Sequence, residues 1–371
     1  MSDTLHPMLT LASWLHTLDP FIVKFTENFG LRWYGTAYLA GFAVAWLLLR
    51  RLSSTPERPG FTPLPRHRVG DALMWLIGGV LVGGRLGYVL IYDPSLLWRF
   101  DSSPPWWGVL AINQGGMASH GGMVGVIIAA WRISRGWRTP EGTVEGRMPA
   151  LHMMDLVAML APAGLLFGRI ANFINGELLG KIVAPPGAPG PWWAVQFPQE
   201  LNGWVGPYQR STLSHTPPLS EEQMARLDAL VTSVQQQRGG TWAQALDWII
   251  DHAAAYADQL RPLLSSRHPS QLYQAVAEGI VVGLVVWAAA ARPRKPGVVG
   301  CWFLITYGVL RVVTEFWRLP DPQFGDAARI MGLSRGQWLS VGMVVIGAAC
   351  LAWVTRRAVP RMGGWLRRAE P

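Results

Sequence analysis

The chain has 371 residues, and its 32 Lys and Arg against 23 Asp and Glu give a formal net charge of +9. Only 15% of residues are charged, against roughly 25% in an ordinary soluble domain, and 20 residues are Trp, which together exclude a soluble enzyme and a disordered chain. The only two cysteines, Cys301 and Cys350, exclude a disulfide scaffold and a cysteine-based metal cluster.

The first predicted element, residues 8–29, is a helix lying along the outer membrane interface. It is not a cleavable signal peptide, because it lacks a cationic start and His16, Asp19 and Pro20 interrupt its apolar run. Seven apolar segments follow, each of about 20 residues and so long enough to cross a bilayer as a helix. They are residues 33–49, 70–92, 115–131, 151–171, 271–291, 298–316 and 337–355.

A long loop separates the fourth and fifth apolar segments. It contains a predicted strand, Trp192–Phe197, and two predicted helices, residues 220–237 and 241–264. The sequence therefore predicts an all-α integral membrane protein, with seven transmembrane helices and a small extracytoplasmic head between the fourth and fifth spans. The predicted domains are an outer-face interfacial segment (1–32), spans one to four (33–171), the head loop (172–270), and spans five to seven with a basic cytoplasmic tail (271–371).

The basic residues alternate between the two sides of these spans. Seventeen of the 32 lie in the segments that follow the first, third, fifth and seventh spans, and only six lie in the short loops opposite. The positive-inside rule then places the N-terminus outside and the C-terminus in the cytoplasm. The high net charge thus indicates membrane orientation, and no nucleic-acid partner is expected.

Only three Lys or Arg residues fall within the spans, namely Arg85, Arg169 and Arg311. Charged groups at membrane depth are costly and usually functional. The predicted orientation puts all three toward the outer ends of their helices, at the same level as Tyr34 and His120. This agreement predicts a site toward the outer leaflet.

The most distinctive local pattern surrounds Arg169. Asn172 lies three residues later on the same helix face, and the turn signal Asn175-Gly176 ends the helix and returns Glu177 toward it. A guanidinium beside an amide suits a phosphate oxygen and a hydroxyl of a lipid headgroup. A structural alternative, in which Arg169 snorkels to the interface and pairs with Glu177, is equally compatible with its position.

The sixth span carries a polar stripe of Tyr307, Arg311, Glu315 and Arg318. Arg311 is either a second phosphate ligand held by Glu315 or one half of a structural ion pair. Arg85 lies among glycines whose spacing of four predicts a close helix-packing face, so its substrate-binding role is the weakest of the three.

His120 is the second residue of the string SHGGMVG (119–125), in which the glycines again predict helix packing. A histidine near two arginines could act as a general base, although a hydrogen bond to a loop would explain it equally well. P-loop, HExxH and GxSxG motifs are absent from the sequence. Few carboxylates beyond Glu177 and Glu315 are expected at the depth of the site, so we expect neither a metal nor another cofactor.

Residues 168–180, GRIANFINGELLG, resemble the signature of bacterial prolipoprotein diacylglyceryl transferase. Six further blocks match that family in the same order: RWYG (32–35), GGRLGYVLIY (83–92), SHGGMVG (119–125), RHPSQLY (267–273), YGVLRVVTEFWRLPD (307–321) and GQWLSVGM (336–343). The family's important residues correspond by position to Tyr34, His120, Arg169, Asn172, Glu177, Gly180, Tyr307, Arg311 and Glu315. Residues 199–265 depart from the family pattern, which leaves the role of the head in acceptor recognition open.

The resemblance implies an enzyme of the bacterial inner membrane that matures lipoproteins. Its partners would be phosphatidylglycerol, the lipobox signal peptide of a preprolipoprotein and the bilayer. It would move a diacylglyceryl group to the lipobox cysteine and release glycerol phosphate. His120, acting directly or through Tyr34 or Tyr307, would take the thiol proton. Arg169 and Arg311 would hold the phosphate.

A rival hypothesis is a non-catalytic anionic-lipid-binding membrane protein or transporter that uses the same arginines. The odd number of spans, the one-sided site and the lack of matching halves disfavour a transporter.

Overall fold

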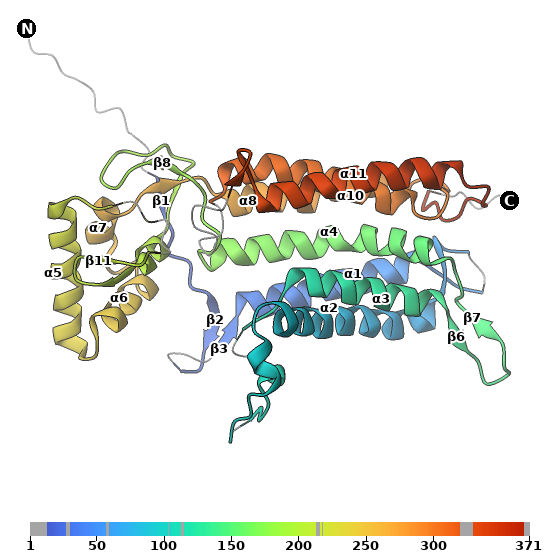
Figure 1. Ribbon diagram of the computed structural model, residues 1–371, viewed down its shortest axis with the longest axis horizontal. Helices are drawn as coiled ribbons and strands as arrows, with labels where there is room; N and C mark the ends of the chain where they lie inside the picture. Colours follow the sequence, from blue (N-terminus) through green and yellow to red (C-terminus); the bar gives the residue numbers. More distant parts are fainter. Residues whose placement is uncertain are drawn as a thin grey trace, which may run out of the picture. The chain divides into compact units, whose positions relative to one another are not determined.

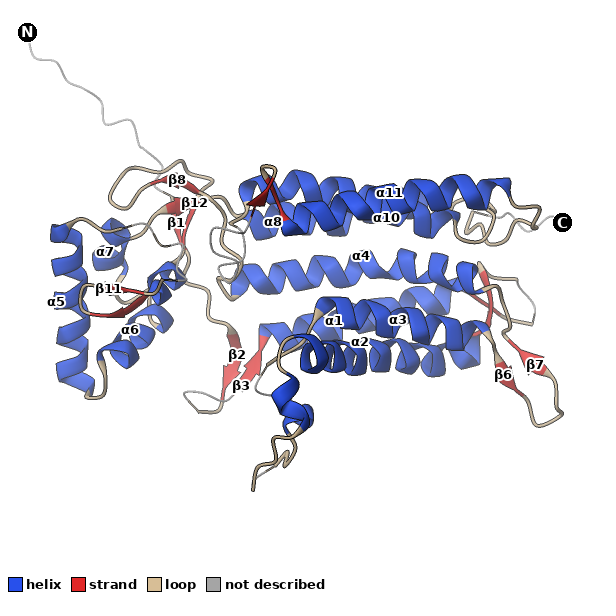
Figure 2. Cartoon of the chain, in the orientation of Figure 1, coloured by secondary structure: helices blue, strands red, loops and turns tan. Residues whose placement is uncertain are grey.

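The computed structural model is mostly helical (Figure 2) and describes residues 13–26, 30–56, 59–102, 104–112, 115–212, 216, 218–319 and 329–366. The chain divides into two compact units. The first comprises Met1–Tyr38, Leu165–Gly279 and Gly308–Gly342, and the second comprises Leu39–Gly164, Ile280–Tyr307 and Met343–Pro371. Residues 8–12 and 27–29 of the predicted interfacial segment, and Arg367 and Arg368 of the tail, lie outside the described residues.

Helices form in all seven apolar segments. They are α1 (Trp33–Leu52), α2 (Val69–Ile91), α3 (Ser119–Ser134), α4 (Ala150–Ile174), the continuous run of α8 (Ser270–Gln274), η7 (Ala275–Val281) and α9 (Val282–Ala289), α10 (Val298–Thr314) and α11 (Arg335–Arg356). Five of the described helices are long and apolar enough to cross a membrane: α2, α4, the α8–α9 run, α10 and α11. Among the other two, α3 has only 16 residues, and α1 begins with two aromatic residues and ends with two arginines before Leu52.

In the second unit, α2 and α3 lie side by side along a row of glycines (Figure 1). A Cβ atom on Gly87 would lie 2.6 Å from the Cα of Gly121, and one on Gly79 would lie 2.6 Å from the carbonyl oxygen of Gly125. Only glycine permits backbones to approach this closely. The predicted packing face is therefore confirmed for both helices.

A buried carboxylate fixes the start of α10 in the same unit. Asp155 of α4 accepts hydrogen bonds from the backbone nitrogens of Gly297 and Gly300, at 2.7 and 2.8 Å. A carboxylate at a helix N-terminus satisfies free N–H groups and complements the helix dipole. Asp155 thereby holds α10 against α4.

The first unit contains a small sheet with the strand order β1-β9-β12-β8. Its strands are β1 (Trp14–Leu15), β9 (Val195–Gln196), β12 (Ser266–Arg267) and β8 (Ile182–Ala184). The strand predicted at Trp192–Phe197 exists, but it is shorter than expected. The remaining strands pair as β2 (Phe21–Lys24) with β3 (Gly30–Arg32), β4 (Ser53–Ser54) with β5 (Thr62–Pro65), β6 (Trp137–Arg138) with β7 (Val144–Glu145), β10 (Trp204–Gly206) with β11 (Gln209–Arg210), and β13 (Arg329–Ile330) with β14 (Leu333–Ser334).

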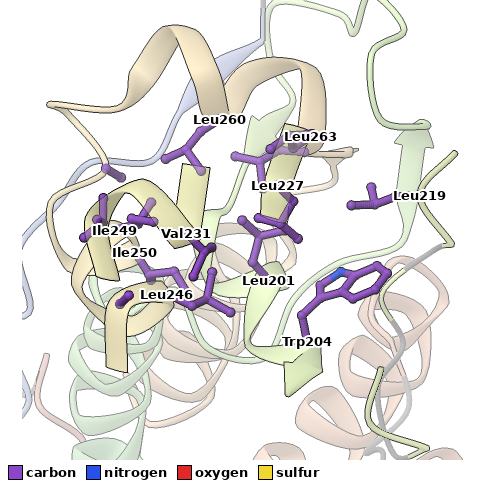
Figure 3. Close-up of a cluster of buried hydrophobic side chains, with 14 of the residues drawn as sticks. Leu201, Trp204, Leu219, Leu227, Val231, Leu246, Ile249, Ile250, Leu260 and Leu263 are labelled. Carbon is purple, nitrogen blue, oxygen red and sulfur yellow. The ribbon is translucent and has the colours of Figure 1, made fainter. Parts of the chain in front are cut away.

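A helical hairpin packs beside this sheet within the first unit. Its helices are α5 (Glu221–Arg238) and α6 (Trp242–Asp251), and each begins with a capping box, at Ser220 and at Thr241. Figure 3 shows their apolar side chains gathered into one buried cluster, in which Val231 and Ile249 are fully buried.

The helix predicted over 241–264 is wrong in its second half. It ends at Asp251, and α7 (Ala257–Leu260) and η6 (Arg261–Leu263) follow after a break. The break lets Leu260 and Leu263 fold back into the same cluster. A single straight helix would place them beyond it.

The N-terminal helix predicted over 8–29 is also wrong within its described residues, where β1 and β2 are strands. The backbone nitrogens of Trp14 and His16 donate to the carbonyl oxygens of Ala194 and Gln196, at 3.0 and 2.9 Å. Strand β9 offers these residues hydrogen-bond partners that an isolated interfacial helix would not have.

Candidate functional site

The turn after α4 brings Glu177 back to Asn172. The helix ends at Ile174, and Gly176 has a φ of +65°, a conformation that glycine adopts without strain. The Nδ2 atom of Asn172 donates to Glu177 Oε2 at 3.0 Å, and the backbone nitrogen of Glu177 donates to the carbonyl oxygen of Asn172 at 3.0 Å. The predicted turn and the return of Glu177 are confirmed.

Arg169 forms its ion pair with a carboxylate that the sequence analysis overlooked, Glu278. The Nε and Nη2 atoms of Arg169 donate to Glu278 Oε2 at 3.0 and 2.9 Å. The Glu278 side chain is fully buried, whereas that of Arg169 is 16% exposed. The structural alternative named Glu177 as the ion-pair partner of Arg169, and the structure shows an ion pair of Arg169 with Glu278. Its signal in the sequence was a carboxylate inside an apolar span, which is costly unless paired.

Arg311 joins the same network from α10. Its Nη1 atom lies 2.9 Å from Glu315 Oε2 and 3.6 Å from Glu278 Oε1, and Glu315 is also 3.4 Å from Arg318 Nη1. The pairing of Arg311 with Glu315, predicted from their spacing of four, is therefore present. We call Arg169, Glu278, Arg311, Glu315 and Arg318 the polar cluster.

The polar cluster gathers guanidinium groups from two helices. Among the described residues, its ion pairs join three guanidiniums to two carboxylates. Glu278 lies in the π-helical segment η7, and such distortions of a helix are frequent at functional sites. Neighbouring guanidiniums can bind a phosphodiester.

Gly180 brings three of the sequence blocks together. A Cβ atom on Gly180 would lie 2.9 Å from the carbonyl carbon of His268, and the Gly180 backbone forms a bridge with Arg318. Its carbonyl oxygen accepts from Arg267 Nη1 at 3.1 Å. The glycine is required because two backbones meet here, so its contribution to the site is structural.

His268 lies beside this junction. Its ring is 5.1 Å from that of Trp193. Burial, together with the nearby charge of Lys181, lowers the pKa of His268 below the ordinary histidine value. The lowered pKa favours the neutral ring, which packs on an aromatic side chain.

Arg85 is saturated by backbone carbonyls within the second unit. It is buried, and its guanidinium donates to the carbonyl oxygens of Gly108, Val109, Gly115 and Gly116 at 2.6 to 2.9 Å. These bonds anchor the loop between α2 and α3. The geometry favours an anchoring role, and substrate binding by Arg85 stays a prediction.

His120 lies in the first turn of α3, also in the second unit, and its side chain is exposed. It lines one end of a groove of about 800 Å³ along α2 and α3, and Asp71 and Trp137 line the other end. The rest of the lining is glycine and apolar side chains. Such a groove suits a hydrocarbon chain.

The two candidate tyrosines belong to different units. Tyr34 lies in the first turn of α1, with its ring 5.3 Å from that of Tyr38. Tyr307 lies in α10, where it stacks on Phe303 at 5.7 Å. Neither residue is a member of the polar cluster. Within the described part of the chain, no three His, Cys, Asp or Glu side chains are grouped as metal ligands.

Comparison with known proteins identifies one family. A family model described as prolipoprotein diacylglyceryl transferase matches residues 20–353. A phosphatidylglycerol–prolipoprotein diacylglyceryl transferase of Bdellovibrio bacteriovorus is 38% identical over 361 residues, which cover 95% of this chain and 97% of the relative. Proteins of the same name from Paraburkholderia phymatum and Ruegeria pomeroyi are 37% and 35% identical, covering 88% and 91% of this chain and 90% and 94% of the relatives.

Proposed function

The chain belongs to the prolipoprotein diacylglyceryl transferase family, and from this premise we propose that it transfers the diacylglyceryl group of phosphatidylglycerol to the lipobox cysteine of preprolipoproteins. The thiolate sulfur attacks the glycerol carbon that bears the phosphate. The sulfur–carbon bond of a thioether forms as the carbon–oxygen bond breaks, and glycerol phosphate leaves with that oxygen. The thiol proton passes to a base. The reaction needs no oxidant, reductant or cofactor.

The observation that carries the proposal is the polar cluster. In the substrate complex Arg169 and Arg311 would stabilise the charge that grows on the departing phosphate. Glu278 lies between both guanidiniums, at 2.9 Å and 3.6 Å, and holds them side by side before the lipid arrives. Asn172, bonded to Glu177, would orient the headgroup. Glu315 would hold Arg311.

His120 is our candidate for the base that takes the thiol proton, with Tyr34 and Tyr307 as possible relays. A neutral imidazole can accept the proton of a thiol, which must be lost to form the attacking thiolate. Neither cysteine of the enzyme is needed as a nucleophile. Cys301 is buried against Val298 and Val354, and Cys350 packs against the same cluster.

The proposed membrane arrangement follows from the lengths of the apolar helices and the distribution of basic residues. We propose seven spans, with α1 and α3 completing the set of five long apolar helices. The distribution of basic residues places the N-terminus outside, the C-terminus in the cytoplasm, and the active site toward the outer leaflet of the bacterial inner membrane. The segment between α4 and α8 would then be an extracytoplasmic head.

The direct test uses detergent-purified protein, phosphatidylglycerol and a lipobox peptide, with mass spectrometry of the peptide. We expect a diacylglyceryl adduct from the natural enzyme and none from Arg169→Ala. Arg226→Ala is the matched control, because Arg226 forms an exposed ion pair in α5 and should transfer normally. Binding of the lipid without any adduct would instead support the non-catalytic alternative. Normal transfer by Arg169→Ala would remove this arginine from the site.

The role of His120 is tested separately through the pH dependence of kcat/KM. For His120→Asn we expect a large loss of rate and loss of the limb of the profile that reports the base. A variant that keeps the profile of the natural enzyme would show that His120 is not the base, even if its rate were lower.

A further inference from the structure

Two glutamines beside the polar cluster are completely buried, and most of their amide atoms lack a protein partner. Gln271 and Gln274 of α8 have no exposed surface. Gln271 Nε2 donates to the carbonyl oxygen of Glu177. Three amide atoms of these two glutamines have no hydrogen-bond partner among the described residues: Nε2 and Oε1 of Gln274, and Oε1 of Gln271.

Such burial is expensive. An amide removed from water without a partner costs roughly 1–3 kcal/mol in proteins, and native structures rarely leave both of its atoms unsatisfied. By contrast, Gln196 in the head is also buried, but its Nε2 atom donates to the carbonyl oxygens of Arg261 and Leu264, at 3.1 and 3.2 Å. The unpaired amide of Gln274 therefore calls for a ligand.

The position of Gln274 indicates which part of a ligand it would meet. Gln271, Gln274 and Glu278 are separated by three and four residues, so they follow one face of the α8–η7 stretch. One end of this row is tied to Glu177, and the other end is Glu278, which pairs with Arg169. Gln274 lies between them in sequence, one helical turn from a carboxylate of the polar cluster.

The chemistry of an amide suits a hydroxyl group. A hydroxyl both donates and accepts, and the Oε1 and Nε2 atoms of Gln274 offer the matching acceptor and donor. An ammonium headgroup only donates, so it could satisfy Oε1 of Gln274 but not Nε2. We propose that Gln274, assisted by Gln271 Oε1, binds the hydroxyls of the glycerol headgroup while the arginines hold its phosphate. This rests on the proposed function and adds the residue that selects the headgroup.

The test compares two donor lipids, phosphatidylglycerol and phosphatidylpropanol. They have the same charge, acyl chains and scissile bond, but the second lacks both headgroup hydroxyls. We expect the natural enzyme to prefer phosphatidylglycerol in kcat/KM by about tenfold or more, because a site built to bind a hydroxyl discriminates strongly against its absence. In Gln274→Met, which keeps the side-chain length, this preference should fall by about tenfold, mainly through loss of activity on phosphatidylglycerol.

The control is Gln196→Met, which also removes a buried amide but should leave the ratio between the two lipids unchanged. Equal use of both lipids by the natural enzyme would overturn the inference without any variant. So would a Gln274→Met enzyme that loses activity on both lipids in the same proportion, which is the behaviour of an amide with a purely structural role. Binding of the two lipids in nanodiscs is measured in parallel. If no transfer occurs with either lipid, the proposed function fails, while the binding preference still tests Gln274.

Discussion

The most clearly defined electrostatic contact of the first unit is the ion pair between Arg267 and Glu200. Both side chains are almost completely buried, at 1% and 0% exposure. Glu200 also accepts hydrogen bonds from the backbone nitrogen and hydroxyl of Ser265, at 3.1 and 2.9 Å, and Arg267 donates to the carbonyl oxygen of Gly180. We therefore predict that Glu200→Gln strongly destabilises this unit, because it leaves a buried guanidinium without its counter-charge.

The expected magnitude follows from the burial. Removing one partner of a buried ion pair costs about 3–5 kcal/mol, whereas an exposed pair contributes about 0–1 kcal/mol. For a unit of about 150–250 residues, 1 kcal/mol corresponds to a change in Tm of roughly 2–4 °C. Glu200→Gln should therefore lower Tm by about 6–20 °C. Replacing both partners, as Glu200→Leu with Arg267→Met, should restore part of the loss, because no unpaired charge remains.

The assay is thermal unfolding in detergent, followed by tryptophan fluorescence, since Trp204 is buried in the same unit. Glu222→Gln is the control. It breaks the exposed pair with Arg226 in α5 and should change Tm by no more than about 4 °C. A Glu200→Gln protein that melts together with this control would refute the assignment of a buried charge pair to this position.

Three further predictions concern other parts of the chain. The double variant Cys301→Ala with Cys350→Ala should retain transfer in the adduct assay, and its loss in a folded protein would indicate a covalent enzyme intermediate. His16 is buried, and burial lowers its pKa below 6.5, so the folded protein favours the neutral ring. The contribution of the neutral ring to stability should be complete above pH 6.5 and fall as the pH drops below that value. The resulting decrease of Tm at low pH should be smaller in His16→Gln. Gly121→Val should abolish the close approach of α2 and α3 and cause aggregation or a large loss of Tm, whereas Gly142→Val, where a Cβ atom would meet nothing, should cost only the strain of its φ of +80°.

The helices were predictable from the sequence because hydropathy over about 20 residues is a local property. So were the ends of α4 and the pairing of Arg311 with Glu315, which depend on residues close in sequence. Arg169 and Glu278 are 109 residues apart, and the local sequence pattern around either residue does not indicate the other as its partner. The carboxylates expected at the depth of the site were Glu177 and Glu315, and this expectation left out Glu278, which joins the two arginines.

The N-terminal strand was missed for a related reason. Trp14 pairs with Val195, which lies far along the chain in the head, and a two-residue strand has no periodicity of its own. Local amphipathicity predicted a helix because it takes no account of a distant backbone edge. A carboxylate or a short polar run inside an otherwise apolar or amphipathic segment therefore indicates a partner that is distant in the sequence.

The blocks that resemble the family signature contain two kinds of residue: glycines that permit close backbone contacts and charged residues that form ion pairs. Gly180 touches His268 and Arg318 through the backbone, so it joins three segments that are far apart in the sequence. Arg169 and Arg311 come from separate helices and share Glu278. One guanidinium could be held by its own helix, but two that would bind one phosphate, as proposed, have to be positioned against each other. The shared carboxylate supplies this positioning, and the glycine junction joins the segment that follows α4 to the one that precedes α8. A signature for a charge-stabilising reaction can therefore contain backbone packing as well as charge.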